Sequence, residues 1–224
     1  MSAPPPLDHD RHAVFLDFDG TLAPLQDDPA RVFLTLPQSA TLVRVATAMS
    51  GAFAIISGRD ILDLGLRTPN DVMRIGGHGL DTCPPGALPR RADGIAPASL
   101  SAALAAIVAR FPEVWLESKG RVLAVHYRAN PDVLDELRGL LASAVADYPD
   151  YSLQAGKMVF EAKPGNANKG VALERAMQAP PFAGRTPVLV GDDRTDEDAM
   201  IAADALGGFG VKVGRGESVA RWRL

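Results

Sequence analysis

The chain has 224 residues, a formal net charge of −4 and 47% hydrophobic residues, which is enough apolar material for one large domain or two modest ones. The negative balance and the lack of any Lys/Arg run argue against nucleic acid or an anionic membrane as a partner. No stretch approaches the roughly 18 apolar residues of a membrane span, and no secretory-signal pattern opens the chain. The single cysteine, Cys83, excludes an intramolecular disulfide. We expect a cytoplasmic protein that acts as a monomer.

The first part of the chain alternates short apolar runs with a helical pattern. Residues 1–11 are Pro-rich and polar, which is typical of a loose tail. The apolar runs at 13–16 and 52–56 predict strands that are buried on both faces of a parallel sheet. Between them, apolar residues at helical spacing after Pro37 predict a helix that stops near Gly51. This order of elements indicates an α/β fold.

The pattern changes after residue 82, where Pro and Gly residues interrupt the chain. An Ala-rich stretch at 97–110 predicts a helix, and a second helix is predicted after Pro131. Each helix is followed by a pair of β segments, at residues 114–117, 121–128, 151–154 and 158–162. Helix, hairpin, helix, hairpin predicts an α+β module with an antiparallel sheet.

The last part of the chain returns to the α/β pattern. It predicts helices that begin near Asn168 and Thr195, and strands at 187–190 and 210–213. We therefore predict a doubly wound, mostly parallel core made of residues 1–82 and 165–224. An α+β domain of residues 83–164 is inserted into this core.

Polar side chains follow three of the predicted strands. Asp17-Phe18-Asp19-Gly20-Thr21 follows the first strand, Ser57-Gly58-Arg59 the second, and Gly191-Asp192-Asp193 a later one. In open α/β sheets, ligands bind at the carboxyl ends of the strands. We therefore expect these side chains to share one crevice, which Lys169 can join from a predicted helix start.

Such a set of side chains suits the hydrolysis of a phosphate ester. One carboxylate can attack phosphorus to form an aspartyl-phosphate, and a second can protonate the leaving alkoxide and then activate water. Because carboxylate and phosphate repel each other, a cation must bridge them, and Mg²⁺ prefers oxygen ligands. Asp17 and Asp19 lie two residues apart, in a loop where Gly20 permits close backbone approach and Thr21 can order the loop or bind phosphate.

Each of these features alone also has a plainer explanation. Asp-x-Asp-Gly is typical of a turn, and Ser57 can cap the helix that follows it. Lys169 can be a solvated surface lysine. Thr195-Asp196-Glu197-Asp198 has the pattern of a helix cap with acids in the first turn. The functional interpretation therefore depends on the features occurring together, in order, at strand and helix ends.

In these residues the sequence resembles the haloacid dehalogenase superfamily of phosphatases. The four shared motifs are Asp17–Thr21, Ser57, Asn168-Lys169-Gly170 and Gly191-Asp192-Asp193. The resemblance implies that Asp17 is the nucleophile, that Asp19 is the general acid and base, and that Ser57 and Lys169 bind the transferred phosphoryl group. It also implies a Mg²⁺ ion held by Asp17, the backbone carbonyl of Asp19 and Asp192, with Asp193 or Asp196 in support.

The sequence is similar, more specifically, to the trehalose-6-phosphate phosphatase family over residues 13–220. Further shared segments are Gly77-His78-Gly79, Glu117-Ser118-Lys119-Gly120, His126-Tyr127-Arg128 and Glu161 before Pro164. This resemblance implies a sugar phosphate as the substrate and an inserted domain that acts as a cap. The substrate-binding residues that it implies are Thr21, Arg59, His78, Glu117, Lys119, His126, Arg128 and Glu161.

The residues of the inserted domain also make physical sense as a sugar site. Alternate residues of a strand share a face, as do Glu117 with Lys119, His126 with Arg128, and Lys157 and Val159 with Glu161. Carboxylates accept hydrogen bonds from hydroxyls, and Lys and Arg donate them. The alternative is a solvent-facing sheet with ordinary ion pairs.

Three features depart from the family pattern. Leu80-Asp81 stands where a Glu is usual, and Lys163 stands where the family often has Arg. The chain also ends at Leu224, where the family usually continues into a final helix.

We expect the hydrolysis of trehalose 6-phosphate to trehalose and phosphate. The alternatives are a phosphatase of sucrose 6-phosphate or of a mannosyl-phosphoglycerate, a non-catalytic sugar-phosphate sensor, and a phosphotransferase. A pure binder has no need of both a nucleophile and an acid, so the presence of Asp17, Asp19, Lys169 and Asp192 argues against the sensor. The charged residues of the inserted domain disfavour the other sugar phosphates, and the phosphotransferase would share every motif.

Overall fold

The computed structural model describes residues 3–26, 28–156 and 158–224. The chain divides into two compact units, the first made of Met1–Arg91 and Asn166–Leu224 and the second of Ala92–Gly165. Strand β4 (Asp81–Cys83) spans the domain boundary predicted after residue 82. It belongs to the first unit because it pairs antiparallel with β3 (Met73–Gly76).

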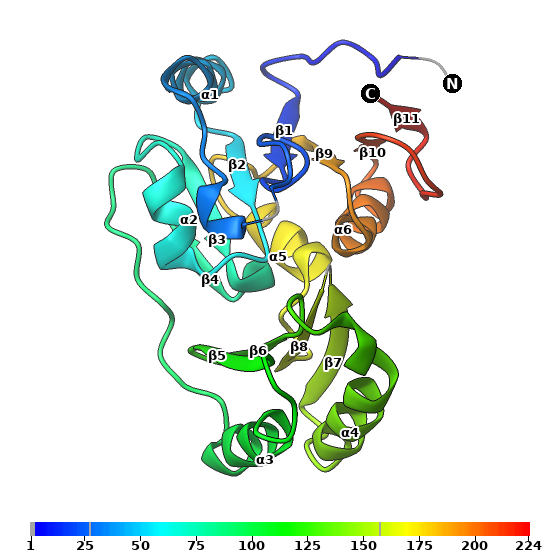
Figure 1. Ribbon diagram of the computed structural model, residues 1–224. Helices are drawn as coiled ribbons and strands as arrows, with labels where there is room; N and C mark the ends of the chain where they lie inside the picture. The colour runs from blue at the N-terminus through cyan, green and yellow to red at the C-terminus, as the bar shows by residue number, and fades with distance from the viewer. Residues whose placement is uncertain (1–2, 27, 157) are drawn as a thin grey trace. The chain divides into compact units, whose positions relative to one another are not determined.

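The first unit is built on a seven-stranded sheet in the order β11-β10-β9-β1-β2-β3-β4, in which only β4 runs antiparallel to its neighbour (Figure 1). The remaining strands are β1 (His12–Leu16), β2 (Phe53–Ile56), β9 (Thr186–Gly191), β10 (Phe209–Lys212) and β11 (Trp222–Arg223). Strand β1 lies between β2 and β9, although β9 is far away in the sequence. The carboxyl ends of these three parallel strands therefore meet at one edge of the sheet.

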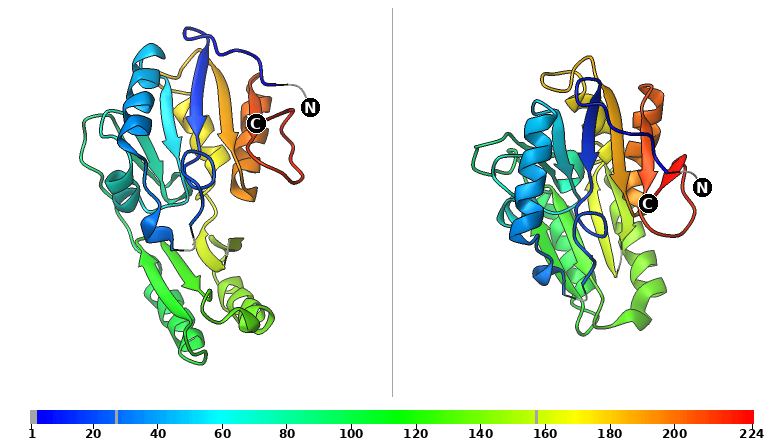
Figure 2. Two further views of the ribbon diagram at one scale, coloured as in Figure 1. Left: turned by 45° about the horizontal axis from the view of Figure 1, so that its top comes forward. Right: turned by 90° about the horizontal axis from the view of Figure 1, so that it is seen from above.

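Helices cover both faces of this sheet (Figure 2). Helices α1 (Leu36–Ala48) and α2 (Ile61–Arg67) share a hydrophobic core with Val14 on one face. Helices α5 (Lys169–Ala176) and α6 (Arg194–Ala205) pack with Phe15 on the other. Because successive side chains of a strand point to opposite faces, neighbours in β1 belong to different cores. The predicted doubly wound α/β fold is confirmed.

Several elements of the first unit were not predicted from the sequence. Apart from α2, which was expected only as the helix that Ser57 could cap, they are β3, β4, β11 and the short 3-10 turns Pro29–Arg31 and Gly77–Gly79. These segments are too short for a hydrophobic period to show itself; β11, for example, has only 2 residues. Helix α6 begins at Arg194, close to the predicted start, but its cap is Asp193 rather than Thr195: the Asp193 carboxylate accepts from the N–H groups of Thr195 and Asp196.

The second unit is an antiparallel sheet in the order β5-β6-β8-β7 with two helices. The elements are α3 (Ala98–Val108), β5 (Trp115–Lys119), β6 (Val122–His126), the 3-10 turn Pro131–Val133, α4 (Leu134–Ala146), β7 (Tyr151–Gly156) and β8 (Val159–Pro164). Both helices share a core with Leu123, Val125 and Phe160, which all lie on one face of the sheet. This confirms the predicted inserted α+β module.

The opposite face of this sheet carries polar side chains, and we call it the polar face. The strand register places Trp115 opposite His126, Glu117 opposite Ala124, and Ala124 opposite Glu161, so these residues share one side. The predicted strand over 121–128 is too long, because β6 ends at His126. The chain then turns, and the N–H of Asn130 donates to the carbonyl of Tyr127 at 2.9 Å. Arg128 is therefore exposed outside the strand.

Candidate active site

Asp17 follows β1 and is buried beside Lys169, the first residue of α5. Lys169 Nζ donates to Asp17 Oδ1 at 2.7 Å and to Asp196 Oδ1 at 2.7 Å. All three side chains are buried, and Asp196, in the first turn of α6, is 0% exposed. Lys169 is therefore not a solvated lysine but a cation held between two buried carboxylates from different elements.

Asp192 completes a cluster of three carboxylates with Asp17 and Asp196. Oxygen atoms from the three side chains all lie within 4.8 Å of one another. Asp196 Oδ2 holds the backbone of the loop between β9 and α6, because it accepts from the N–H groups of Asp192 and Asp193 at 3.0 and 3.1 Å. Gly20, with φ +87°, lies so close that a Cβ would come 2.1 Å from Asp192 Oδ2. A side chain at position 20 would displace the carboxylate of Asp192.

The electrostatics of the cluster follow from its crowding. Burial raises the pKa of Asp17 well above its usual value, although Lys169 opposes this shift. Burial and the neighbouring Asp193 and Asp196 raise the pKa of Asp192. Burial lowers the pKa of Lys169, but Asp17 and Asp196 outweigh it and raise that pKa overall. The cluster thus keeps Lys169 charged and still carries more carboxylates than one lysine neutralises.

The carboxylate of Asp19 lies outside this cluster and is bound by Arg59. Arg59 donates to Asp19 through Nη2 at 2.6 Å and Nε at 2.7 Å, a two-point contact with a planar donor. The Nη1 of Arg59 also donates to Asp63 Oδ2 at 2.7 Å. Thr21, two residues after Asp19, contacts the cluster instead: its hydroxyl donates to Asp192 Oδ1 at 3.3 Å.

Ser57 directly follows β2, the strand next to β1. Its hydroxyl oxygen accepts from the N–H of Arg59 at 3.1 Å. It does not cap a helix, since α2 is capped by Asp60, which accepts from the N–H of Leu62 at 2.9 Å. His78 is buried next to this turn, and a Cβ on Gly58 would lie 2.5 Å from its Cε1 atom. Any side chain at position 58 would therefore collide with the imidazole of His78.

In the second unit, the polar face gathers four of the predicted sugar-binding residues. His126 Nε2 lies 2.9 Å from Glu117 Oε2. Lys119 Nζ lies 3.6 Å from Glu117 Oε2 and 3.4 Å from Glu161 Oε1. The hydrogen bond with His126 is the main cause of a lowered pKa at Glu117. Arg128 does not join this group, and Lys157 lies outside the described residues.

Comparison with known proteins identifies the family. The profile of the family described as Trehalose-phosphatase matches residues 15–221. The chain belongs to the trehalose-phosphatase family. It is 39% identical over 218 residues to the trehalose-6-phosphate phosphatase of Escherichia coli (strain K12), across 96% of this chain and 82% of the relative.

Solved structures support the fold of this trehalose-phosphatase family member. The C-terminal domain of C. albicans trehalose-6-phosphate phosphatase superposes with a TM-score of 0.81 at 24% identity, over 96% of this chain and 87% of that one. A haloacid dehalogenase-like hydrolase from B. subtilis gives a TM-score of 0.62 at 18% identity, over 94% of each chain. The fold inferred from the four motifs is therefore confirmed.

Two residues of this family member have a larger part in the site than the sequence indicated. Asp196, predicted only in support, lies at the centre of the cluster. Lys212, at the end of β10, is buried; its Nζ donates to the carbonyl of Asp192 and lies 4.0 Å from Glu197 Oε1. The available signal in the sequence was a lysine directly after the apolar residues 209–211 of a strand that is mostly buried.

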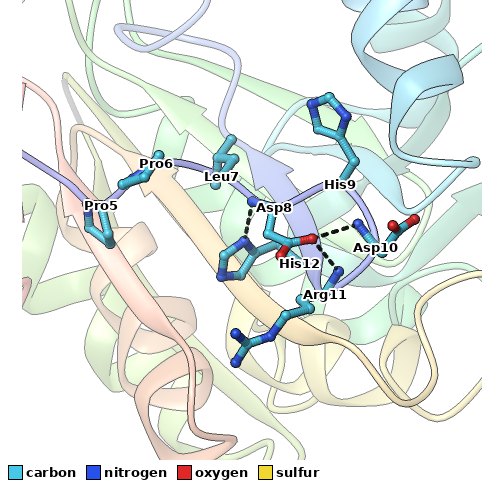
Figure 3. Close-up of a pocket in the computed structure, with 8 residues that line it drawn as sticks. All are labelled: Pro5, Pro6, Leu7, Asp8, His9, Asp10, Arg11 and His12. Atoms are coloured by element: carbon cyan, nitrogen blue, oxygen red, sulfur yellow. Dashed lines mark hydrogen bonds between the residues drawn. The ribbon is translucent and has the colours of Figure 1, made fainter.

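A shallow hollow at the other end of β1 does not belong to the site. It is lined by residues 5–12 of the N-terminal segment (Figure 3). Asp8 Oδ1 accepts from the N–H groups of Asp10 and Arg11, and His12 Nδ1 accepts from the N–H of Asp8. Arg185 Nη1 also donates to the carbonyls of His9 and His12, which ties the turn to the start of β9. The hollow adjoins the amino end of β1, whereas Asp17 follows its carboxyl end.

Within the described part of the chain, the helices are too short or too polar to cross a membrane.

Proposed function

We propose that this member of the trehalose-phosphatase family hydrolyses trehalose 6-phosphate to trehalose and phosphate, through an aspartyl-phosphate on Asp17. The observation that supports the mechanism best is the buried contact of 2.7 Å between Asp17 and Lys169. It puts a carboxylate nucleophile beside a cation that can offset phosphoryl charge. The substrate is supported by relatives whose names specify trehalose 6-phosphate.

The carboxylate cluster fits a Mg²⁺ ion. Its donors are all oxygen atoms, which Mg²⁺ prefers. Burial is the first cause of the raised pKa values of Asp17 and Asp192, and neighbouring carboxylates raise both further; a divalent cation would offset the charge of these carboxylates. Asp17 and Asp192 would hold the ion with the backbone carbonyl of Asp19, and Asp196 would support them. When bound, Mg²⁺ would neutralise charge on the phosphoryl oxygens.

In the first step, a carboxylate oxygen of Asp17 attacks phosphorus. The new O–P bond forms as the P–O bond to the sugar breaks, and the electron pair passes to the sugar oxygen. Asp19 gives that oxygen a proton and thereby releases the sugar. Since Asp19 is bound by Arg59 in the structure, its carboxyl group must turn away from Arg59 to act.

In the second step, Asp19 removes a proton from water, and the water oxygen attacks the same phosphorus. The bond between phosphorus and Asp17 breaks, which releases phosphate and restores the carboxylate. Lys169 and Ser57 bind the phosphoryl oxygens through both steps. We assign Thr21, Arg59 and His78 to the binding of the substrate.

We further propose that the polar face of the second unit recognises the disaccharide. Glu117, Glu161 and Lys119 offer acceptors and donors on one side of a sheet, as the hydroxyls of a sugar require. Their mutual contacts hold the side chains in place before a sugar binds, which lowers the entropy cost of binding.

The test is phosphate release from a panel of sugar phosphates, with Mg²⁺ and with EDTA. We expect the highest kcat/KM for trehalose 6-phosphate, loss of activity in EDTA and recovery on adding Mg²⁺. A higher kcat/KM for sucrose 6-phosphate or mannosyl-phosphoglycerate would replace the proposed substrate. Binding without phosphate release would show a sensor, and sugar release that exceeds phosphate release would show a phosphotransferase.

Two properties of the whole protein remain predictions. Cys83 is buried and free, which supports the proposed reducing, cytoplasmic setting. A monomer is expected, and gel filtration coupled to light scattering would test this.

A further inference from the structure

Trp115 is a large aromatic side chain that the proposed mechanism does not use. It opens β5, at the edge of the second unit's sheet, and is 52% exposed. Its register partner is His126, which places it on the polar face beside Glu117 rather than in the core with α3 and α4. A single exposed aromatic side chain is common on protein surfaces, so the role of Trp115 must be argued from what surrounds it.

The indole ring is held in a fixed orientation. It stacks on the imidazole of His126, with ring centroids 4.0 Å apart and an angle of 13° between the planes. His126 is in turn fixed by its contact of 2.9 Å with Glu117 Oε2. One face of the indole is thus covered by the imidazole, and the exposed fraction shows that much of the rest is open to solvent.

We propose that Trp115 is a platform for one pyranose ring of the substrate. A pyranose has C–H groups on its faces and hydroxyls around its rim, so it stacks on a flat apolar ring while charged neighbours bind the rim. Glu117 lies two residues along the same strand, about 7 Å away, and Lys119 follows it on the same face. This inference rests on the proposed function and adds a residue that selects for a sugar.

A plain cross-strand pair is the competing explanation. Stacked aromatic pairs stabilise antiparallel sheets without binding anything. The two explanations differ in what a sugar does to the exposed side of the indole: a platform becomes shielded by the ligand, whereas a cross-strand pair stays open to solvent.

Fluorescence can test this, because the chain has only two tryptophans, Trp115 and Trp222. Trp222→Phe leaves Trp115 as the single reporter. We expect trehalose to reduce the quenching of Trp115 by acrylamide, and inorganic phosphate to have no such effect. Unchanged quenching at saturating trehalose would overturn the platform, whether or not the enzyme turns over trehalose 6-phosphate.

Kinetics provide the second measurement. We expect Trp115→Ala to raise KM for trehalose 6-phosphate about tenfold, which corresponds to about 1.4 kcal/mol, with KM for p-nitrophenyl phosphate unchanged. Trp115→Phe, which keeps a stacked ring, should recover most of the loss. An unchanged KM in Trp115→Ala, or equal losses on both substrates, would overturn the inference. Failure of the wild-type enzyme on trehalose 6-phosphate would instead overturn the proposed function.

Discussion

Lys169 and Asp17 form an ion pair of 2.7 Å in which the side chains are only 2% and 5% exposed. Such a pair is costly to desolvate, and removing one partner leaves an uncompensated buried charge. The second contact of Lys169, with Asp196, ties the proposed nucleophile Asp17 to the first turn of α6. The same ion pair therefore contributes both to the stability of the fold and to the proposed reaction. Variants of Asp17 and of Lys169 can separate these two contributions.

Asp17→Asn should abolish turnover and leave the fold intact. The amide has nearly the same shape as the carboxylate, but it is a far weaker nucleophile toward phosphorus. We expect kcat to fall by about a thousandfold or more, with an unchanged circular dichroism spectrum. Substantial residual activity in a preparation free of wild-type enzyme would refute the assignment of Asp17 as the nucleophile.

Lys169→Met should unfold more easily as well as lose activity. Without the ammonium group, Asp17 and Asp196 face each other as buried carboxylates, and we expect a loss of about 3–5 kcal/mol in the free energy of unfolding. Urea unfolding measures this loss. Adding Asp17→Asn to Lys169→Met removes one of the two charges and should restore part of the stability. A double variant as unstable as the sum of the single variants would contradict the pairing.

Glu161→Ala should discriminate between substrates. Glu161 lies beside Lys119 on the polar face, where its carboxylate can accept a hydrogen bond from a sugar hydroxyl. Loss of a hydrogen bond to a charged group costs about 1.5–3 kcal/mol. We expect kcat/KM for trehalose 6-phosphate to fall at least about tenfold, and that for p-nitrophenyl phosphate to change little. Glu136→Ala is the matched control, since Glu136 is exposed on α4, which packs on the other face. Equal losses on both substrates would argue against a sugar-reading face.

Asp63 holds Arg59 through a contact of 2.7 Å, and the pH dependence of stability in Asp63→Asn tests whether the charge of Asp63 stabilises the fold. Burial raises the pKa of Asp63, but hydrogen bonds from Arg67 and Arg59 outweigh it and leave the pKa below its usual 3.8. A pKa that is lower in the folded protein adds stability above the unfolded-state pKa and loses it as the pH falls through the folded-state pKa.

In urea unfolding, Asp63→Asn should therefore be less stable than the wild type at pH 7, and the difference should shrink below about pH 4. Asp71→Asn, at an exposed position, is the control and should change little at either pH. A difference that stays constant with pH would show that the charge of Asp63 is not involved.

The sequence predicted those parts of the fold whose signal is local. Residues 13–16 of the strand that ends before Asp17 are an apolar run, and Ala residues at 97–110 indicated α3 without any tertiary information. Strand β4 was missed because only its pairing with β3 defines it. Strand β6 was predicted too long, since nothing in the letters His126-Tyr127-Arg128 marks the turn.

The candidate site also divides into residues with a local signal in the sequence and residues that only the three-dimensional structure reveals. Asp17, Lys169 and Asp192 could be found because each lies beside a strand or helix end that is visible in the sequence. The central place of Asp196 could not, because its sequence context is that of an ordinary first helical turn. Only in three dimensions does this carboxylate accept from Lys169 and from the N–H groups before α6.

The position of β1 between β2 and β9 has a consequence for synthesis on the ribosome. Strand β9 follows the whole second unit in the sequence, so β1 has an open edge until residues 186–191 emerge. The second unit, by contrast, is continuous and can complete its own sheet and helices first. We expect nascent chains that stop before β9 to expose apolar strand edges and to need chaperones, whereas longer chains close the central sheet and complete the carboxylate cluster in the same event.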